Sequence, residues 1–311
     1  MVISWLLLFL AAAVVSLIIT FPVVWVLEFF KLTQHIREEG PSSHRSKAGT
    51  ITMGGVGFVI ALMAMSLIFI DFDLKLQYLA LILMTFGFAL VGFADDMIKV
   101  YRQRNQGLSF WQKIVSQTIL AAFFSGILIY LGHHAAAGWF SHPIFYFLFS
   151  VFIIVGTANA ANLTDGLNGL LAGSSTIAFI AFAFLASRSG FQNATTFALL
   201  AAGAIFAFLY FNFPKAKLFM GDVGSLSIGA ALAGIAIIIH RELWLAVIGG
   251  VFLIEALSVI LQVASYKFFR RRIFKMTPLH HHFEMLGFKE VVVVIGFWIA
   301  AAILGVIGVL I

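Results

Sequence analysis

Ten apolar runs of roughly 20 residues follow one another through this chain and constrain its fold more than any other feature. About 20 helical residues cross the hydrocarbon core of a bilayer, which is about 30 Å thick. Only 10% of the residues are charged, against about 25% in a soluble domain. We therefore predict an all-α polytopic membrane protein with about ten transmembrane helices, formed as a single domain over residues 1–311. The runs lie at residues 3–30, 51–70, 76–95, 111–132, 143–162, 168–187, 194–212, 222–240, 243–267 and 291–311.

The first run is expected to stay in the protein as a span. It has no basic segment before it and no small-residue cleavage site, which a removed signal peptide would need. The chain also contains no cysteine, so disulfides, thiolate metal sites and cysteine nucleophiles are excluded.

Basic residues are distributed unevenly among the connections between the runs. Of the 19 Lys and Arg residues, all but Lys75, Arg188 and Arg241 lie in connections that alternate along the chain. The positive-inside rule places these connections in the cytoplasm and both termini outside. The polar motifs fall in the same connections, so we expect a cytoplasmic active-site cleft. A membrane transporter is the alternative, but we find no internal repeat, which many transporters have.

An Asp-Asp pair closes the third run, in the segment Phe93-Ala-Asp-Asp-Met-Ile-Lys99. Carboxylates at the mouth of a span are costly to desolvate and often mark a functional site. Asp95 and Lys99 share a helical face, whereas Asp96 is turned about 100° from Asp95. The two aspartates are therefore expected to have different roles. The alternative is a solvated helix end paired with Lys99.

Three further connections carry small and polar residues. Lys47 lies in a Gly- and Ser-rich connection that suits phosphate binding or is an ordinary positive-inside loop. Asn162, Asp165 and Asn168 are spaced by three and should face a polar cavity or form an interhelical hydrogen-bond knot. Asp222 follows Gly221 at the start of a run, where it is either a ligand-facing carboxylate or a helix cap.

The last cytoplasmic connection contains three consecutive histidines, His280 to His282. Consecutive residues on a regular element cannot all point to one zinc ion. The accompanying aspartates suit a hard cation such as Mg²⁺ better. We therefore expect one or two of the histidines to bind phosphate or sugar. A basic cluster at residues 267–272 precedes them and could contact membrane lipid headgroups.

Together these motifs resemble the polyprenyl-phosphate N-acetylhexosamine-1-phosphate transferases. The matching elements are SHRSKAGTITMGG, FADDMIKV, GLSFWQK, NAANLTDGLNGL, KLFMGDVGSL and PLHHHFE, spread over residues 43–284. The last element points to the branch that uses UDP-MurNAc-pentapeptide. The resemblance implies transfer of phospho-MurNAc-pentapeptide to undecaprenyl phosphate, which yields lipid I and UMP for peptidoglycan synthesis. A UDP-GlcNAc:undecaprenyl-phosphate GlcNAc-1-phosphate transferase is the alternative within the family.

The resemblance also implies Mg²⁺, a bacterial plasma-membrane location, a homodimer and no nucleic-acid partner. It implies catalytic roles for Asp95, Asp96, Asp222 and His281. The expected metal ligand is Asp222, with Asp95 or Asp165 nearby. The expected substrate-binding residues are Lys47, Lys99, Lys113, Asn162, Asp165, Asn168, Asn212, Gln262, His280 and His282.

Four positions depart from the family pattern, namely Ile51, Val223, Asn168 and Lys215. Asn168 stands where an aspartate near the nucleotide is expected, and an amide there can still contact uracil. We expect Asp96 to interact with the attacking lipid phosphate. A phosphate monoester loses its second proton near pH 6, so direct attack is favoured over an aspartyl-phosphate intermediate on Asp95 or Asp96.

Overall fold

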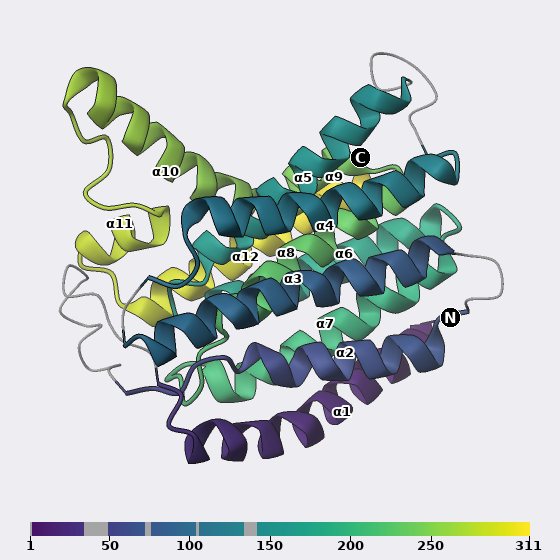
Figure 1. The fold of residues 1–311 in the computed structure, drawn as a ribbon, viewed down its shortest axis with the longest axis horizontal. Helices are drawn as coiled ribbons and strands as arrows, with labels where there is room; N and C mark the ends of the chain where they lie inside the picture. The colour runs from purple at the N-terminus through teal and green to yellow at the C-terminus, as the bar shows by residue number, and fades with distance from the viewer. Residues whose placement is uncertain (1, 34–48, 72–75, 104–105, 134–141) are drawn as a thin grey trace.

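The computed structural model describes residues 2–33, 49–71, 76–103, 106–133 and 142–311. These residues form an all-α fold, as predicted (Figure 1). The helices are α1 (Val2–Phe29), α2 (Gly55–Phe69), α3 (Leu76–Tyr101), α4 (Phe110–Tyr130), α5 (Pro143–Thr164), α6 (Leu170–Arg188), α7 (Gln192–Asn212), α8 (Gly221–Ile238), α9 (Glu242–Ile248), α10 (Gly250–Phe269), α11 (Leu279–Met285) and α12 (Glu290–Leu310).

Each of the ten predicted runs contains helix. Among the described residues, nine helices are long and apolar enough to cross a membrane, whereas α2, with 15 residues, is shorter. The ninth run was predicted as one stretch, but it divides into α9 and α10 at Gly249. Two consecutive glycines stand at this break, and glycine is the residue that weakens a helix interior most after proline. Beyond the break, α10 diverges from the bundle (Figure 1).

Helix α8 lies at the centre of the fold. Its residues from Val223 to Ile238 are all buried, and it packs against α3 and α5. Many of these residues are Gly, Ala or Ser, which let neighbouring helix backbones approach closely. The centre of the bundle is therefore built for close packing rather than for contact with lipid.

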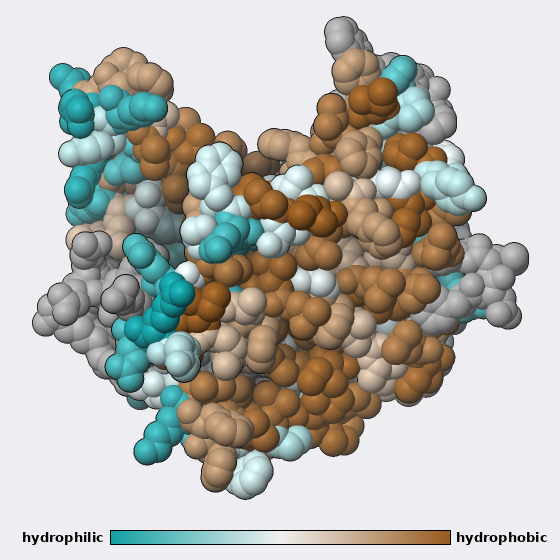
Figure 2. Space-filling model, in the orientation of Figure 1, coloured by the Kyte–Doolittle hydropathy of each residue, from teal (hydrophilic) through white to brown (hydrophobic). Residues whose placement is uncertain are grey.

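The outer helices expose large apolar side chains. Examples are Leu7 on α1, Phe152 on α5, Ile260 on α10 and Ile303 on α12. In the space-filling view the apolar surface forms a broad band, and hydrophilic residues gather toward the end where α10 and α11 lie (Figure 2). An apolar exterior of this kind requires lipid around it. The chain is a multi-pass membrane protein.

Candidate active site

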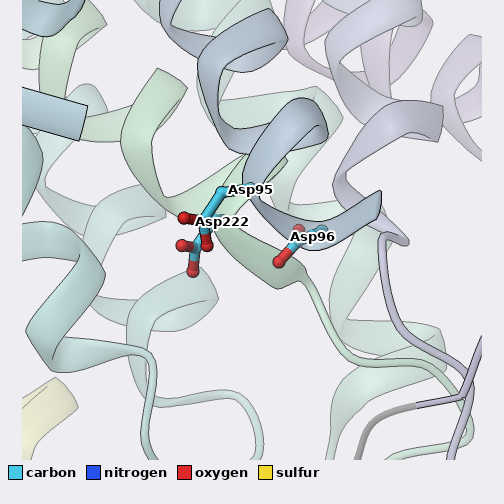
Figure 3. A group of neighbouring side chains, drawn as sticks. All are labelled: Asp95, Asp96 and Asp222. Atoms are coloured by element: carbon cyan, nitrogen blue, oxygen red, sulfur yellow. The ribbon is translucent and has the colours of Figure 1, made fainter. Parts of the chain in front are cut away.

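Three aspartates from two helices meet near the hydrophilic end of the bundle (Figure 3). Asp95 and Asp96 lie in the last turns of α3, and Asp222 lies in the first turn of α8. One carboxylate oxygen from each residue lies within 4.8 Å of the others. Asp95 and Asp96 are only 3% and 4% exposed. Three carboxylates this close and this buried need cations or hydrogen-bond donors to offset their charge.

Two glycines allow the aspartates to meet. A β-carbon on Gly92 of α3 would collide with the backbone carbonyl of Asp222, so α3 and α8 touch backbone to backbone at this point. Gly221 has a φ of +75°, which favours glycine. A β-carbon there would collide with the Asp96 carboxylate. The two glycines next to the motifs thus bring the carboxylates of α3 and α8 together.

Two lysines hold the carboxylates. Lys99 Nζ lies 2.6 Å from Asp95 Oδ2, 3.3 Å from Asp96 Oδ1 and 3.0 Å from Asp222 Oδ2. Lys113 Nζ, from α4, lies 2.6 Å from the same oxygen of Asp222. Two ammonium groups thus face three carboxylates, and a further cation would add to the neutralisation of this cluster.

Asp95 and Asp96 have different surroundings. The backbone N–H of Leu108, just before α4, donates to Asp95 Oδ1 at 2.9 Å. The backbone N–H of Val223, in α8, donates to Asp96 Oδ2 at 3.3 Å. Asp95 lies beside Asp222, whereas Asp96 stands apart (Figure 3). Their positions on the helix therefore give the two carboxylates different neighbours.

The end of α5 contributes an amide and a fourth carboxylate. Asn162 Nδ2 donates to Asp222 Oδ1 and to Ser225 Oγ, both at 2.8 Å. Asp165 is the C-cap residue of α5 and is not part of the three-aspartate cluster. Burial raises the pKa of Asp165 to about 7, and the negative charges of Asp222 and Asp96 add to this shift. Asp165 therefore lies within electrostatic reach of the cluster.

Asn168 and Asn212 form hydrogen bonds within the protein. The backbone N–H of Asn168 donates to Glu290 Oε1 at 2.8 Å, and its side chain donates to the Pro214 carbonyl at 3.2 Å. Asn212, 2% exposed, accepts from the Gly169 N–H and donates to the Leu218 carbonyl. Asn212 thus supports the turn that follows Asp165, and its predicted contact with substrate stays a prediction.

The three histidines point to different partners, as expected on the short helix α11. His280 Nδ1 lies 3.1 Å from Glu255 Oε2, and both side chains are fully buried. His281 Nδ1 lies 2.9 Å from Glu284 Oε2. His282 Nδ1 accepts from the backbone N–H of Lys275. Within the described residues, the histidines belong to no cluster of potential metal ligands.

Gln262 and Lys47 complete the predicted set. Gln262 of α10 accepts from the backbone N–H groups of Ile273 and Phe274 and donates to the carbonyl of Phe274. It therefore fixes the segment between α10 and α11. Lys47 lies outside the described residues.

Sequence reasoning missed two residues of this region, Ser225 and Glu255. Ser225 lies three residues after Asp222 and shares its amide donor, Asn162. Glu255 is the one acidic residue of α10, and it lies within the apolar run from Val251 to Leu261. A lone ionisable residue within a span is a functional hypothesis by default, so this signal was available in the sequence.

The cluster fits the ion that the sequence motifs imply. All three ligand groups are carboxylates, and Mg²⁺ prefers oxygen ligands. One oxygen from each carboxylate lies within 4.8 Å of the others, a spacing at which all three groups could reach one ion. Asp95, Asp96 and Asp222 are thus a suitable donor set for Mg²⁺.

Comparison with known proteins identifies the family. A family model described as glycosyl transferase family 4 matches residues 78–240. The chain is 43% identical over 308 residues to the phospho-N-acetylmuramoyl-pentapeptide-transferase of Bacillus velezensis, covering 95% of this chain and 94% of that protein. The chain belongs to glycosyl transferase family 4. The protein of the same name from Shouchella clausii is 44% identical, over 98% of this chain and 97% of its own length. The one from Bacillus subtilis is 43% identical, over 91% of this chain and 90% of its own length.

The part matched by the glycosyl transferase family 4 model includes the three-aspartate cluster, both lysines and Asn162. The histidine helix α11 lies beyond that part. The relatives, by contrast, match more than nine-tenths of the chain. The cluster thus lies within the part matched by the family model, and the likeness to the named transferases extends well beyond that part.

Proposed function

We propose that this chain transfers phospho-MurNAc-pentapeptide from UDP-MurNAc-pentapeptide to undecaprenyl phosphate, giving lipid I and UMP. The observation that carries the proposal is the buried cluster of Asp95, Asp96 and Asp222 with Lys99 and Lys113. This is a phosphate-handling site at one end of a membrane bundle, in a chain whose relatives carry the name of that transferase.

The reaction is a phosphoryl transfer. An oxygen of the lipid phosphate attacks the sugar-linked phosphorus of the donor, and the bond from that phosphorus to the bridging oxygen breaks, so that UMP leaves. Catalysis of such reactions depends mainly on positioning and on neutralising charge. The site supplies both, because the amines of Lys99 and Lys113 are held in place by carboxylates from two helices.

The site residues then have distinct roles. Asp95, Asp96 and Asp222 would hold Mg²⁺, which when bound neutralises charge on the diphosphate. Lys99 and Lys113 contact phosphate oxygens. Asn162 keeps the Asp222 carboxylate in position through its 2.8 Å hydrogen bond. His281 and its neighbours on α11 contact the sugar phosphate.

The apolar faces of α5 and α10 provide a place for the lipid acceptor. Both helices expose large apolar side chains, including Leu148 and Phe152 on α5 and Leu257 and Leu261 on α10. A notch opens in the surface between the ends of these two helices (Figure 2). We place the isoprenoid chain along these faces, with its phosphate toward Asp96.

The same proposal includes the arrangement in the membrane. The basic residues of the segment between α10 and α11, such as Arg270 and Lys275, favour a cytoplasmic active site, with ten spans and both termini outside. Membrane lipids surround the apolar exterior. Assembly as a homodimer follows from the family resemblance and is tested by cross-linking the protein in membranes.

A donor-competition assay tests the function. Purified protein is given undecaprenyl phosphate with either UDP-MurNAc-pentapeptide or UDP-GlcNAc, and UMP release is followed. We expect release from the first donor, dependent on Mg²⁺ and on the lipid, and none from the second. Preference for UDP-GlcNAc would overturn the proposal. A stoichiometric burst of UMP with donor alone, together with a phosphorylated aspartate, would show a covalent route in place of direct attack.

A further inference from the structure

Glu255 is an acidic residue buried inside α10, and none of the roles above uses it. Its side chain is fully buried. The apolar run around it, Val251 to Leu261, contains no other charged residue. An ionised carboxylate costs several kcal/mol to bury unless it is paired and hydrogen-bonded. A charge retained at this position therefore needs a partner that offsets the cost.

That partner is His280. Glu255 Oε1 accepts from the backbone N–H of His280 at 3.2 Å, and Oε2 lies 3.1 Å from His280 Nδ1. Within the described part of the chain, the hydrogen bonds of this carboxylate all go to His280. A carboxylate that bonds one ring nitrogen fixes the tautomer and the orientation of an imidazole. Here the proton is placed on Nδ1, facing Glu255.

The other ring nitrogen faces the loop that carries Asp165. His280 Nε2 is buried and makes no hydrogen bond to the described residues. It lies against Gly166, where an added β-carbon would collide with Nε2 and approach Cε1 to 2.7 Å. An unpaired buried ring nitrogen is destabilising, because it loses its hydrogen bond to water and gains none in the protein. A nitrogen left unpaired beside Asp165 is poised for a group of a bound ligand.

We propose that Glu255 is a positioning residue for the transfer reaction, which orients His280 so that Nε2, left as an acceptor, faces a hydroxyl or N–H group of the sugar part of the donor beside the Asp165–Gly166 turn. This inference rests on the proposed function. If Glu255 had a purely structural role, it would only accept a hydrogen bond from the backbone N–H of His280. The amide oxygen of a glutamine accepts that hydrogen bond equally well. The variant Glu255→Gln keeps that acceptor and the volume of the side chain, but removes the charge.

A double-mutant cycle tests the proposal, with Glu255→Gln, His280→Asn and the double variant. Removing a partner that orients an active-site histidine typically costs 10–100-fold in activity. We expect Glu255→Gln to lower kcat/KM for the donor by that factor, with KM for undecaprenyl phosphate unchanged. The double variant should be no worse than His280→Asn alone, because Glu255 acts only through the ring. Glu242→Gln, at the other end of the same broken span, is the matched control and should retain full activity.

Losses that multiply in the double variant would overturn the proposal, as would full activity of Glu255→Gln. If Glu255→Gln does not fold, the same cycle is run with Glu255→Asp, which keeps the charge but withdraws it from the ring.

A second readout does not depend on turnover. Nitrogen NMR of ¹⁵N-histidine-labelled protein, with the His280 signal assigned from His280→Asn, should show a proton on Nδ1 that Glu255→Gln redistributes. An unchanged signal would overturn the inference. Lack of UMP release by the unaltered protein would instead refute the proposed function, while the NMR result would still test the role of Glu255.

Discussion

Replacing Gly92 by alanine adds one methyl group where α3 and α8 touch, about one turn before the Asp95-Asp96 pair. The new β-carbon would lie 2.5 Å from Val223 N and closer still to the Asp222 backbone. Real β-carbons essentially never approach a heavy atom within 3.0 Å, and the nearest atom, the carbonyl oxygen of Asp222, would lie at 2.2 Å. The two helices must therefore separate locally by about 0.8 Å. Neighbouring atoms belong to the backbone and cannot rotate away.

This separation would affect stability and catalysis together. Overpacking a close helix contact costs about 1–3 kcal/mol. It also moves Asp222 away from Asp95, and a displacement on the order of 1 Å can cost about 100-fold in rate. We therefore expect Gly92→Ala to lower kcat by one to two orders of magnitude and to lower the thermal midpoint. UMP release and thermal unfolding in detergent measure the two effects.

Gly126→Ala is the matched control, because nothing lies within 4 Å of a β-carbon at Gly126. It lies within helix α4, where alanine is favoured over glycine by about 0.5–1 kcal/mol. This variant should be fully active and at least as stable as the unaltered protein. If Gly92→Ala matched Gly126→Ala in both measurements, the argument that the close contact of α3 and α8 builds the site would be refuted.

Three other predictions follow from the geometry. Asp95→Asn should weaken donor binding more than Asp96→Asn does, and Asp96→Asn should lower turnover more than Asp95→Asn does, because the two carboxylates have different neighbours. Identical kinetic profiles of the two variants would contradict this division. Removing divalent cations with EDTA should abolish UMP release and added Mg²⁺ should restore it, whereas activity that persists in EDTA would contradict a metal role for the cluster. Gly166→Ala should reduce donor use, since its methyl group displaces the His280 ring, and normal donor kinetics would show that the ring position is unimportant.

Much of the fold was predictable from local sequence. Runs of about 20 apolar residues coincide with helices because hydrocarbon thickness sets the length of a spanning helix. The break at Gly249 was not predicted, because mean hydropathy over a window of about 20 residues hardly changes at two glycines. The helix nevertheless ends at this glycine pair. The number of spans and their orientation depend on the membrane itself, and here they rest on the distribution of lysine and arginine.

The candidate site was predictable as a set of residues but not as a set of contacts. Asp95, Asp96 and Asp222 stood out because charge is costly at the mouth of a span. Asp222 lies 126 positions from Asp96, and their proximity depends on the packing of α3 against α8. Likewise, the hydrogen bonds of the Asn212 amide to the Gly169 N–H and the Leu218 carbonyl depend on the fold, and its contact with substrate stays a prediction.

Glu255 is a site residue that the sequence analysis did not predict. Its charge inside an apolar run was visible in the sequence, but its partner His280 follows 25 residues later, on a separate short helix. Periodicity within one helix cannot show such a pair, because the intervening chain turns back on itself. Tertiary structure is needed to see that one histidine of the triplet is held by a buried carboxylate.

The central claim is that the sugar-linked phosphorus of the donor moves to the lipid. The most direct test uses UDP-MurNAc-pentapeptide labelled with ³²P in the β-phosphate, with undecaprenyl phosphate and Mg²⁺. We predict that the label moves entirely into the lipid fraction while unlabelled UMP is released in equal amount. Label that stays with the nucleotide as UDP, or that appears as inorganic phosphate, would contradict it.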